Sequence, residues 1–331
     1  MLTKVLYILA YARSGTTILA SLLGEIDGFF HAGELWYFWD RCFPPRSMAR
    51  CGCWAVLPEC PLWSAVLDTL ASSDASDSLK ACHRTVGPSG VCHPALSKMV
   101  ELQKQADRSV RYWHPLKGVV PRIRQSEAVE GFCRVQGALY RTIEAQTGAK
   151  VIVDSSKLPA PAVLLTEIPG IEPYFVHMVR DPRGVFFSRQ RRRMEQSGRG
   201  NFNPPLLALD AFQCARDNLY SEAIVRRFGI GRRLFVSYER FVTKPRETIN
   251  AIGELVGMPV DSVPLAGHTA RLKTNHTVRA NRNRFQTGEV EIRHDVDWQA
   301  ALGGRDRLLG SLLAAPLLLR YGYPLQTASS R

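Results

Sequence analysis

Short runs of consecutive apolar residues alternate with stretches of helical periodicity along this chain. Val5–Leu9 is the first apolar run, and Ile18, Leu19, Leu22 and Leu23 then recur at helical spacing after a polar loop. A run that is apolar at every position is typical of a strand buried on both faces, and the spacing after it is typical of an amphipathic helix. The chain therefore opens with a predicted strand, loop and helix.

The same alternation returns in the second half of the chain. Apolar runs at Val151–Val153, Tyr174–Val179 and Leu234–Val236 are predicted strands, and Phe132–Gln146 and Ala211–Phe228 are predicted helices. Strands that alternate with helices form parallel sheets covered on both faces. We therefore expect an α/β fold, a doubly wound parallel sheet like that of P-loop nucleotide-binding proteins, with residues 1–331 in a single domain.

Residues 40–121 depart from this alternation. They hold six of the eight cysteines, scattered prolines and a Ser/Asp-rich stretch at 72–78. Long segments without regular periodicity are either functional or irregular connections. We expect an insertion that packs beside the sheet and shapes an acceptor pocket, and an irregular structural region is the alternative.

Several cysteines gather near the start of this insertion. Cys42, Cys51, Cys53 and Cys60 can form part of a zinc site, but their spacing does not match a standard pair of C-x-x-C knuckles. Without an export signal, cysteines are more often free than disulfide-bonded. We expect free buried thiols and no metal in the chemistry, and a structural metal is the alternative. Further candidate ligands are Cys82, His83, Cys92 and His93.

Basic residues outnumber acidic ones, since 43 Lys and Arg against 30 Asp and Glu give a net charge of +13. This balance favours an anionic partner. Part of it is a basic run, Arg189 with Arg191, Arg192 and Arg193, which is either a solvated helix face or a path for an anionic acceptor. No helix-turn-helix, zinc-finger or aromatic stacking motif stands out, so nucleic acid is not an expected partner.

Two apolar segments are candidates for an export or membrane signal. Val5–Ala10 is shorter than the apolar region of a signal peptide. Leu308–Leu319 is interrupted by Pro316 and falls short of the roughly 20 residues that span a bilayer. We interpret it as a buried C-terminal helix, and we expect a soluble, cytoplasmic protein without a transmembrane segment.

The loop after the first predicted strand is suited to phosphate. Gly15 permits a tight turn and a close backbone approach, and the helix that follows begins with free N–H groups that attract an anion. Arg13 adds a permanent positive charge, and Ser14, Thr16 and Thr17 add hydroxyls. An ordinary strand-to-helix turn is the alternative interpretation of this loop alone.

A second basic motif follows the strand predicted at Tyr174–Val179. Arg180 leaves the carboxyl end of that strand, Pro182 suits a first helical turn, and Ser188 lies one to two turns further on. Ligand groups in open α/β sheets come from the carboxyl ends of strands. Arg180 therefore stands where a second phosphate can bind.

Together the two motifs resemble the donor-binding motifs of sulfotransferases that use 3′-phosphoadenosine 5′-phosphosulfate (PAPS). The resemblance rests on Arg-Ser-Gly-Thr-Thr at Arg13–Thr17, and on Arg-Asp-Pro-Arg at Arg180–Arg183 with Ser188 eight residues after the first Arg. It implies that Arg13–Thr17 hold the 5′-phosphosulfate and that Arg180 and Ser188 hold the 3′-phosphate.

Two later segments extend the resemblance. Tyr238–Phe241 looks like the Tyr-Glu segment beside the nucleotide in that family, and Asn281–Phe285 followed by Trp298 looks like the segment that closes over the donor. The resemblance thus implies donor contacts for Tyr238, Asn281 and Arg284.

The catalytic residues implied by the resemblance are Glu34 and Lys157. The cytosolic branch uses a His base, which the segment Val153–Lys157 lacks, whereas Glu34 resembles the base of tyrosylprotein and several bacterial carbohydrate sulfotransferases. Glu34 would accept the acceptor proton, and Arg13 with Lys157 would stabilise the leaving phosphate. Trp36–Trp39 after Glu34 are favoured as core residues over acceptor-stacking rings.

Two other functions and several acceptors remain. A small-molecule P-loop kinase needs a Gly-Lys-Ser/Thr ending that this loop lacks, and a non-catalytic nucleotide-binding scaffold would bind nucleotide without transfer. The acceptor is open among a small molecule, a saccharide, a lipid and a protein tyrosine, and the pattern does not predict the oligomeric state.

Overall fold

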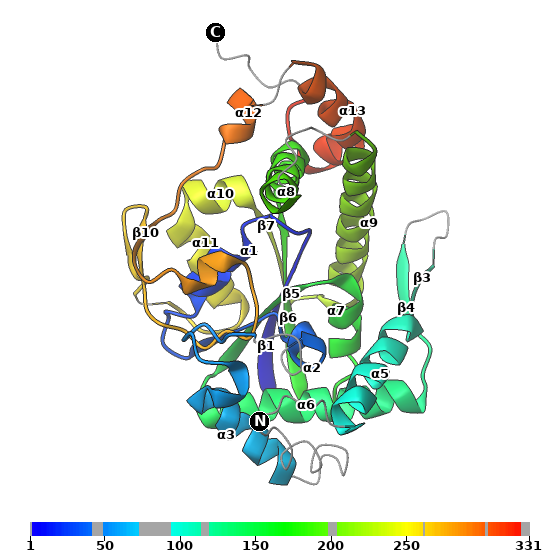
Figure 1. Ribbon diagram of the computed structural model, residues 1–331, viewed down its shortest axis with the longest axis vertical. Helices are drawn as coiled ribbons and strands as arrows, with labels where there is room; N and C mark the ends of the chain where they lie inside the picture. Colours follow the sequence, from blue (N-terminus) through cyan, green and yellow to red (C-terminus); the bar gives the residue numbers. More distant parts are fainter. Residues whose placement is uncertain are drawn as a thin grey trace.

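The computed structural model describes residues 2–41, 49–72, 94–113, 119–197, 204–260, 262–301 and 304–325. Its centre is a five-stranded parallel sheet in the order β2-β5-β1-β6-β7 (Figure 1). The strands are β1 (Thr3–Ala10), β2 (Phe29–Gly33), β5 (Val151–Lys157), β6 (Ile171–Val179) and β7 (Arg233–Ser237).

Helices cover both faces of this sheet. The central strand β1 divides its side chains between the two sides, with Val5, Tyr7 and Leu9 in one core and Leu6 and Ile8 in the other. This division explains why the run is apolar at every position. One face carries α1 (Thr16–Leu23), α10 (Tyr238–Thr243) and α11 (Pro245–Leu255), and the other carries α6 (Glu127–Thr147), α7 (Pro159–Leu165) and α9 (Pro204–Phe228).

The predicted parallel α/β fold is confirmed, and each of the four predicted strands is present. Strand β2 was not predicted. Its sequence, Phe29–Gly33, is short and contains a histidine and a glycine, so it lacks a continuous apolar run. It lies at the edge of the sheet, next to β5.

The described part of residues 40–121 is more regular than its sequence indicated. It begins at the end of α2 (Phe38–Arg41), which is continuous with the 3-10 turn Leu35–Tyr37. A 3-10 turn at Leu57–Glu59 and two helices, α3 (Pro61–Ser72) and α5 (Pro94–Ser109), follow. Strand β3 (Val110–Trp113) then pairs with β4 (Val120–Ile123). Trp63, Leu70 and Met99 from α3 and α5 share one core with Phe132 and Leu139 of α6. The segment therefore forms a further helical layer outside α6.

The C-terminal part adds a small antiparallel sheet and a helical group. The sheet consists of β8 (Leu265–Ala266), β9 (Thr269–Leu272) and β10 (Gly288–Glu291), with a 3-10 turn at Arg282–Phe285 between the last two. The helices are α8 (Pro182–Ser197), α12 (Asp297–Ala301) and α13 (Gly304–Tyr321). Helix α13 packs on α8 and α9 in a separate core (Figure 1).

The predicted C-terminal helix exists as α13, but it is buried on one side only. Leu317 and Leu318 are buried, whereas Leu308, Leu312 and Leu319 are each more than 60% exposed. Pro316 lies within the helix rather than ending it. Within the described residues, none of the helices is both long enough and apolar enough to cross a bilayer.

Candidate active site

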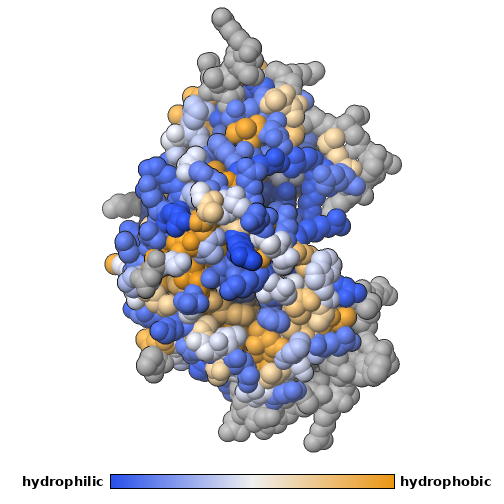
Figure 2. Space-filling model, turned by 90° about the vertical axis from the view of Figure 1, so that its left-hand side faces the viewer, coloured by the Kyte–Doolittle hydropathy of each residue, from blue (hydrophilic) through white to orange (hydrophobic). Residues whose placement is uncertain are grey.

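A polar cavity of about 770 Å³ opens where β1, β5 and β6 end. Figure 2 shows hydrophilic residues gathered around a hollow on this side of the molecule. Every predicted site residue lines the cavity except Ser14 and Arg284. The residues that do are Arg13, Gly15, Thr16, Thr17, Glu34, Lys157, Arg180, Ser188, Tyr238 and Asn281.

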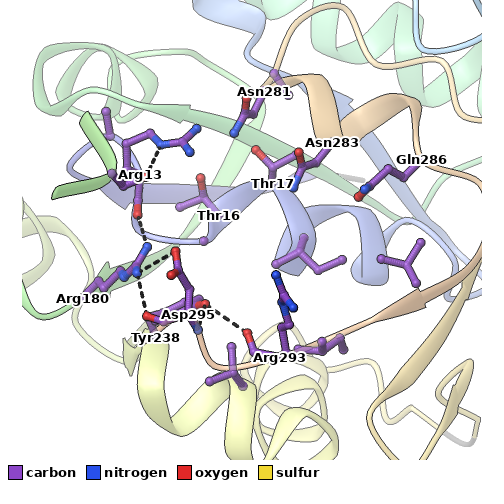
Figure 3. Close-up of a pocket in the computed structure, with 18 of the residues that line it drawn as sticks. Arg13, Thr16, Thr17, Arg180, Tyr238, Asn281, Asn283, Gln286, Arg293 and Asp295 are labelled. Atoms are coloured by element: carbon purple, nitrogen blue, oxygen red, sulfur yellow. Dashed lines mark hydrogen bonds and ion pairs between the residues drawn. The ribbon is translucent and has the colours of Figure 1, made fainter. Parts of the chain in front are cut away.

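The loop between β1 and α1 forms one wall of the cavity (Figure 3). Gly15 has a φ of +85°, and a Cβ on it would lie 2.5 Å from Cδ2 of Tyr238, so the position requires glycine. Thr16 and Thr17 begin α1 and place its first N–H groups at the cavity. The hydroxyl of Ser14 turns away, because it is buried and donates to the carbonyl of Tyr11 at 2.8 Å.

Arg13 occupies a strained backbone position in this loop. Its φ is 76°, in the left-handed region that non-glycine residues avoid. Its Nε donates to the hydroxyl of Ser188 at 2.9 Å, which links the first loop to α8. Burial, together with the nearby Arg192 and Arg180, lowers the pKa of Arg13. A bound anion would relieve this crowding of positive charge.

Arg180 is held from several sides at the end of β6. Its guanidinium donates to the carbonyl of Arg13 at 3.1 Å, pairs with the carboxylate of Asp295 at 3.1 Å, and lies 4.5 Å from the ring centroid of Tyr238 (Figure 3). Only 6% of the side chain is exposed. Arg180, Arg13 and Ser188 therefore form one continuous side of the cavity, which we call the basic wall.

Glu34 and Lys157 meet on the other side of the cavity. The ammonium of Lys157 contacts the Glu34 carboxylate in a short ion pair, and Nε of Arg279 approaches the second carboxylate oxygen at 3.3 Å. Arg279 also lies 4.2 Å over the ring of Tyr37. The Glu34 side chain is 12% exposed, so one carboxylate sits between two cations at the edge of the cavity.

A local irregularity in β5 aims Lys157 into the cavity. The pairing register with β1 shifts between Asp154 and Lys157, and the register with β2 shifts between Val153 and Asp154. Lys157 has a φ of 73°. Bulges of this kind redirect side chains beside active sites. Buried Asp154 stabilises the bend by accepting bonds from the backbone and hydroxyl of Ser156 and from Tyr140, and burial raises the pKa of this carboxyl. Asp154 thus supports the turn and does not contact Lys157.

One histidine lies near this pair, on β2. His31 is buried, and its Nε2 lies 3.3 Å from the hydroxyl of Ser155. Burial lowers the pKa of His31 to about 3, so its imidazole is neutral at physiological pH. The side chain does not line the cavity that contains Glu34. Its placement is that of a core histidine.

A C-terminal segment, residues 275–297, forms another wall of the cavity; we call it the strap. The strap residues Asn281, Asn283, Gln286 and Arg293 line the cavity, and its 3-10 turn packs against α1 (Figure 3). The prediction for Arg284 does not match its position. Arg284 is buried, and its Nη2 donates to the carbonyl of Arg50 at 2.6 Å, outside the cavity. Trp298, just after the strap, is buried against Arg183 of α8.

A model of the sulfotransferase family matches residues 6–262 of this chain. The chain belongs to the sulfotransferase family. A search of curated proteins found no match.

Solved structures of sulfotransferases align with most of this chain. The sulfotransferase domain from the curacin biosynthetic pathway is 16% identical, with a TM-score of 0.52, covering 98% of this chain and 99% of that one. The sulfotransferase domain of the Synechococcus PCC 7002 olefin synthase is 18% identical, with a TM-score of 0.49 and coverage of 98% and 96%. A sulfotransferase from Alicyclobacillus acidocaldarius is 12% identical, with a TM-score of 0.41 and 98% coverage of both chains. The first of these three structures shows a likeness of the fold alone.

The basic run of this sulfotransferase divides between two roles. Arg189 and Arg193 both pair with the fully buried carboxylate of Asp210, at 2.9 and 2.6 Å. Arg191 and Arg192 line the cavity beside Ser188. Arg189 and Arg193 thus hold α8 to α9. Arg191 and Arg192 extend the basic wall of the cavity.

The aromatic run after Glu34 also divides. Phe38 and Trp39 are buried, as predicted for core residues. Trp36 packs edge-on against Phe132 with ring centroids 5.5 Å apart, and Tyr37 lies under Arg279. These rings support the segment that carries Glu34.

Three cysteines of the insertion converge with a histidine of the strap. Cys51, Cys53, Cys60 and His276 each offer one ligand atom, and these atoms all lie within 4.8 Å of one another. The other candidate ligands lie outside the described residues; they are Cys42, Cys82, His83, Cys92 and His93.

Sequence reasoning missed three residues of the strap that matter here: Arg279, His276 and Asp295. None of them stands in a motif, and each meets its partner only through the fold. The one signal was their nearness to the Asn-Arg-Asn-Arg segment after Ala280.

Proposed function

We propose that this sulfotransferase transfers the sulfuryl group of PAPS to an acceptor hydroxyl. The observation that carries the proposal is the layout of the cavity. A basic wall built from Arg13, Arg180 and Ser188 lies in the same cavity as the Glu34–Lys157 pair. The first feature suits a donor with two phosphate groups, and the second suits proton removal and charge stabilisation.

The two ends of the basic wall fit the two anionic ends of the donor. The 5′-phosphosulfate would accept bonds from the start of α1 and from Thr16, Thr17 and Arg13. The 3′-phosphate would contact Arg180 and Ser188. Arg180 pairs with Asp295 in the described structure, so the phosphate would displace this carboxylate. Tyr238 and Asn281 would stand beside the nucleotide.

The transfer step uses Glu34 and Lys157. Glu34 accepts the proton of the acceptor hydroxyl as the acceptor oxygen attacks sulfur, and the bond between sulfur and the bridging phosphate oxygen breaks. The leaving group is 3′,5′-adenosine bisphosphate. Lys157 and Arg13 stabilise the negative charge that develops on its 5′-phosphate. A glutamate base is what the resemblance to the tyrosylprotein and bacterial carbohydrate enzymes implies, and the chemistry as written needs no metal.

The experiment combines the protein with isotopically labelled PAPS and a panel of saccharide, lipid, phenolic and peptide acceptors, and detects products by mass. Wild type should form a sulfated product without added Mg²⁺. Glu34→Gln should lower the rate by about 10² to 10⁴-fold while retaining bisphosphate binding. Glu101→Gln, an exposed change on α5, is the control.

Two outcomes of the same experiment favour the alternatives. Turnover of ATP that requires Mg²⁺, with none of PAPS, would indicate a small-molecule kinase. Bisphosphate binding without a product from any acceptor in the panel would favour a nucleotide-binding scaffold. Unchanged sulfation by Glu34→Gln would refute the base assignment.

A further inference from the structure

Outside the active site, one cluster of metal-ligating side chains stands out. Cys51, Cys53 and Cys60 come from the insertion, and His276 comes from the strap. Cys51 and Cys60 are fully buried, and Cys53 is half-buried. Three thiols and an imidazole that face one another at a mostly buried position are an unusual combination for simple core packing.

Three distances within the cluster are close to those of a tetrahedral site, and all its ligand atoms lie within 4.8 Å of one another. Sγ of Cys60 lies 3.7 Å from Sγ of Cys53 and 3.2 Å from Nδ1 of His276, and Sγ of Cys51 lies 3.8 Å from the same Nδ1. A Zn²⁺ ion with bonds of about 2.3 Å to sulfur and about 2.0 Å to nitrogen places its ligands about 3.5 to 3.8 Å apart. Little rearrangement is needed to close such a site.

We propose that Cys51, Cys53, Cys60 and His276 bind one structural Zn²⁺ ion. The set consists of three thiolates and one imidazole, a combination that four-coordinate structural zinc sites use. Because all four positions are filled by protein, no position is left for water or substrate. The ion would therefore stabilise the fold and take no part in sulfuryl transfer.

The backbone around the cysteines is already shaped for this role. An isolated bridge joins Arg50 to Val56 and encloses a tight turn, in which the N–H of Cys51 donates to the carbonyl of Ala55 at 2.8 Å. Trp54, at the tip, has a φ of 72° and stacks on Phe285 with ring centroids 4.2 Å apart. A strained residue held by its surroundings is a common feature of ligand-binding turns.

The turn and the strap are in direct contact beside the cluster. The N–H of Gly52 donates to the carbonyl of Thr277 at 3.0 Å, and Nε1 of Trp63 donates to the carbonyl of His276 at 2.7 Å. A Cβ on Gly52 would lie 1.9 Å from Oδ1 of Asn275, so the close approach requires glycine. These contacts hold the imidazole against the thiols.

The position of the cluster gives the ion a consequence for the active site. Three residues after His276, the carbonyl of Arg279 accepts from the N–H of Glu34 at 2.7 Å, and the N–H of Val278 donates to Ala32 at 2.9 Å. A metal bond at His276 would fix the strap immediately before it reaches Glu34. Zinc would thereby hold Arg279 in place without touching the cavity.

The test is metal analysis of the full chain, purified under reducing conditions from zinc-supplemented cells. Elemental analysis and native mass spectrometry should find about one Zn²⁺ per chain. Cys53→Ser and His276→Ala should lose most of this zinc. Cys133→Ser and Cys214→Ser remove buried thiols elsewhere in the fold, and His268→Ala removes an exposed histidine. These three controls should retain the ion.

Wild-type protein alone can refute the proposal, so misfolded variants do not leave it undecided. Protein that is isolated without zinc and gives no thiolate-type visible absorption with Co²⁺ would overturn it. So would an intact mass two hydrogens below the reduced value, mapped to a disulfide within this cluster. Full zinc in both ligand variants would overturn the ligand assignment. Each readout is independent of PAPS.

Discussion

The first loop and the strap both line one cavity, yet they are built in different ways. The loop at Arg13–Thr17 lies between β1 and α1, and its shape follows from the turn and helix start within a few residues. The strap reaches the cavity from the C-terminal part of the chain, through contacts of Arg279 with Glu34 and of Asp295 with Arg180.

This difference separates two tasks. The loop supplies backbone N–H groups and hydroxyls for an anion, a function that a short contiguous sequence can provide. The strap sets the surroundings of two charged residues, Glu34 and Arg180, and this depends on long-range packing. We therefore expect changes in the loop to affect donor binding directly, and changes in the strap to tune a site that still works.

Among the changes that test this difference between loop and strap, the largest effect is expected at Lys157, which lies in the same cavity as both. Lys157→Met keeps the length of the side chain but removes the charge that stabilises the leaving phosphate. The rate of sulfuryl transfer should fall by about 10² to 10³-fold. Single-turnover kinetics with PAPS would measure the fall. Lys104→Met, on α5, is the control and should be neutral.

The next largest effect is expected in the loop. Gly15→Ala places a Cβ against Tyr238 and strains a backbone with a φ of +85°. The affinity for 3′,5′-adenosine bisphosphate should therefore fall by at least about tenfold, which corresponds to a loss of about 1.4 kcal/mol in binding free energy. Calorimetric titration would measure it. Gly267→Ala also has a positive φ, but a Cβ there meets no atom within 4 Å. An equal loss in both variants would show that backbone strain, rather than the loop, was tested.

A smaller effect is expected in the strap. Arg279→Ala removes one of the two cations at Glu34 and leaves Lys157 in place. Charge-assisted contacts of this kind contribute about 1.5 to 3 kcal/mol when buried. The Arg279 side chain is 33% exposed, so solvent weakens its contact with Glu34. We therefore expect kcat to fall by about tenfold. Bisphosphate affinity should be unchanged. Arg282→Ala, in the same segment, is the control. A loss in affinity as large as that of Gly15→Ala would end the distinction between loop and strap.

The smallest effect has the opposite sign. Asp295→Asn removes the carboxylate that competes with phosphate for Arg180. The affinity for the bisphosphate should therefore rise, by about threefold, because one ion pair no longer has to be broken. Titration at two salt concentrations would measure it. Weaker binding by this variant would indicate that Asp295 helps to close the strap over the donor.

The sequence predicted the parts of this molecule whose structure is decided locally. The buried strand at Val5–Leu9, the loop after it and the pair Arg180 and Ser188 are contiguous patterns, and the fold brings them to one cavity. Glu34 and Lys157 were expected at the site only through the family resemblance, and both line the same cavity.

The rest depended on contacts between distant residues. Nothing near Arg279 indicates that its carbonyl and side chain meet Glu34, and nothing near His276 indicates three cysteines of the insertion. Arg284 shows the converse case. It belongs to a segment that resembles a donor-binding one, yet it bonds to Arg50, because the 3-10 turn at Arg282–Phe285 directs it toward the insertion.

Above all, we propose that the basic wall binds a nucleotide carrying both a 5′- and a 3′-phosphate. Titration of wild type with 3′,5′-adenosine bisphosphate and with 5′-AMP tests it without knowledge of the acceptor. The bisphosphate should bind at least about tenfold more tightly, and Arg180→Ala should abolish most of that difference, since a charge-assisted bond to phosphate is worth about 1.5 to 3 kcal/mol. Equal affinity of wild type for the two nucleotides would mean that the basic wall does not bind the 3′-phosphate.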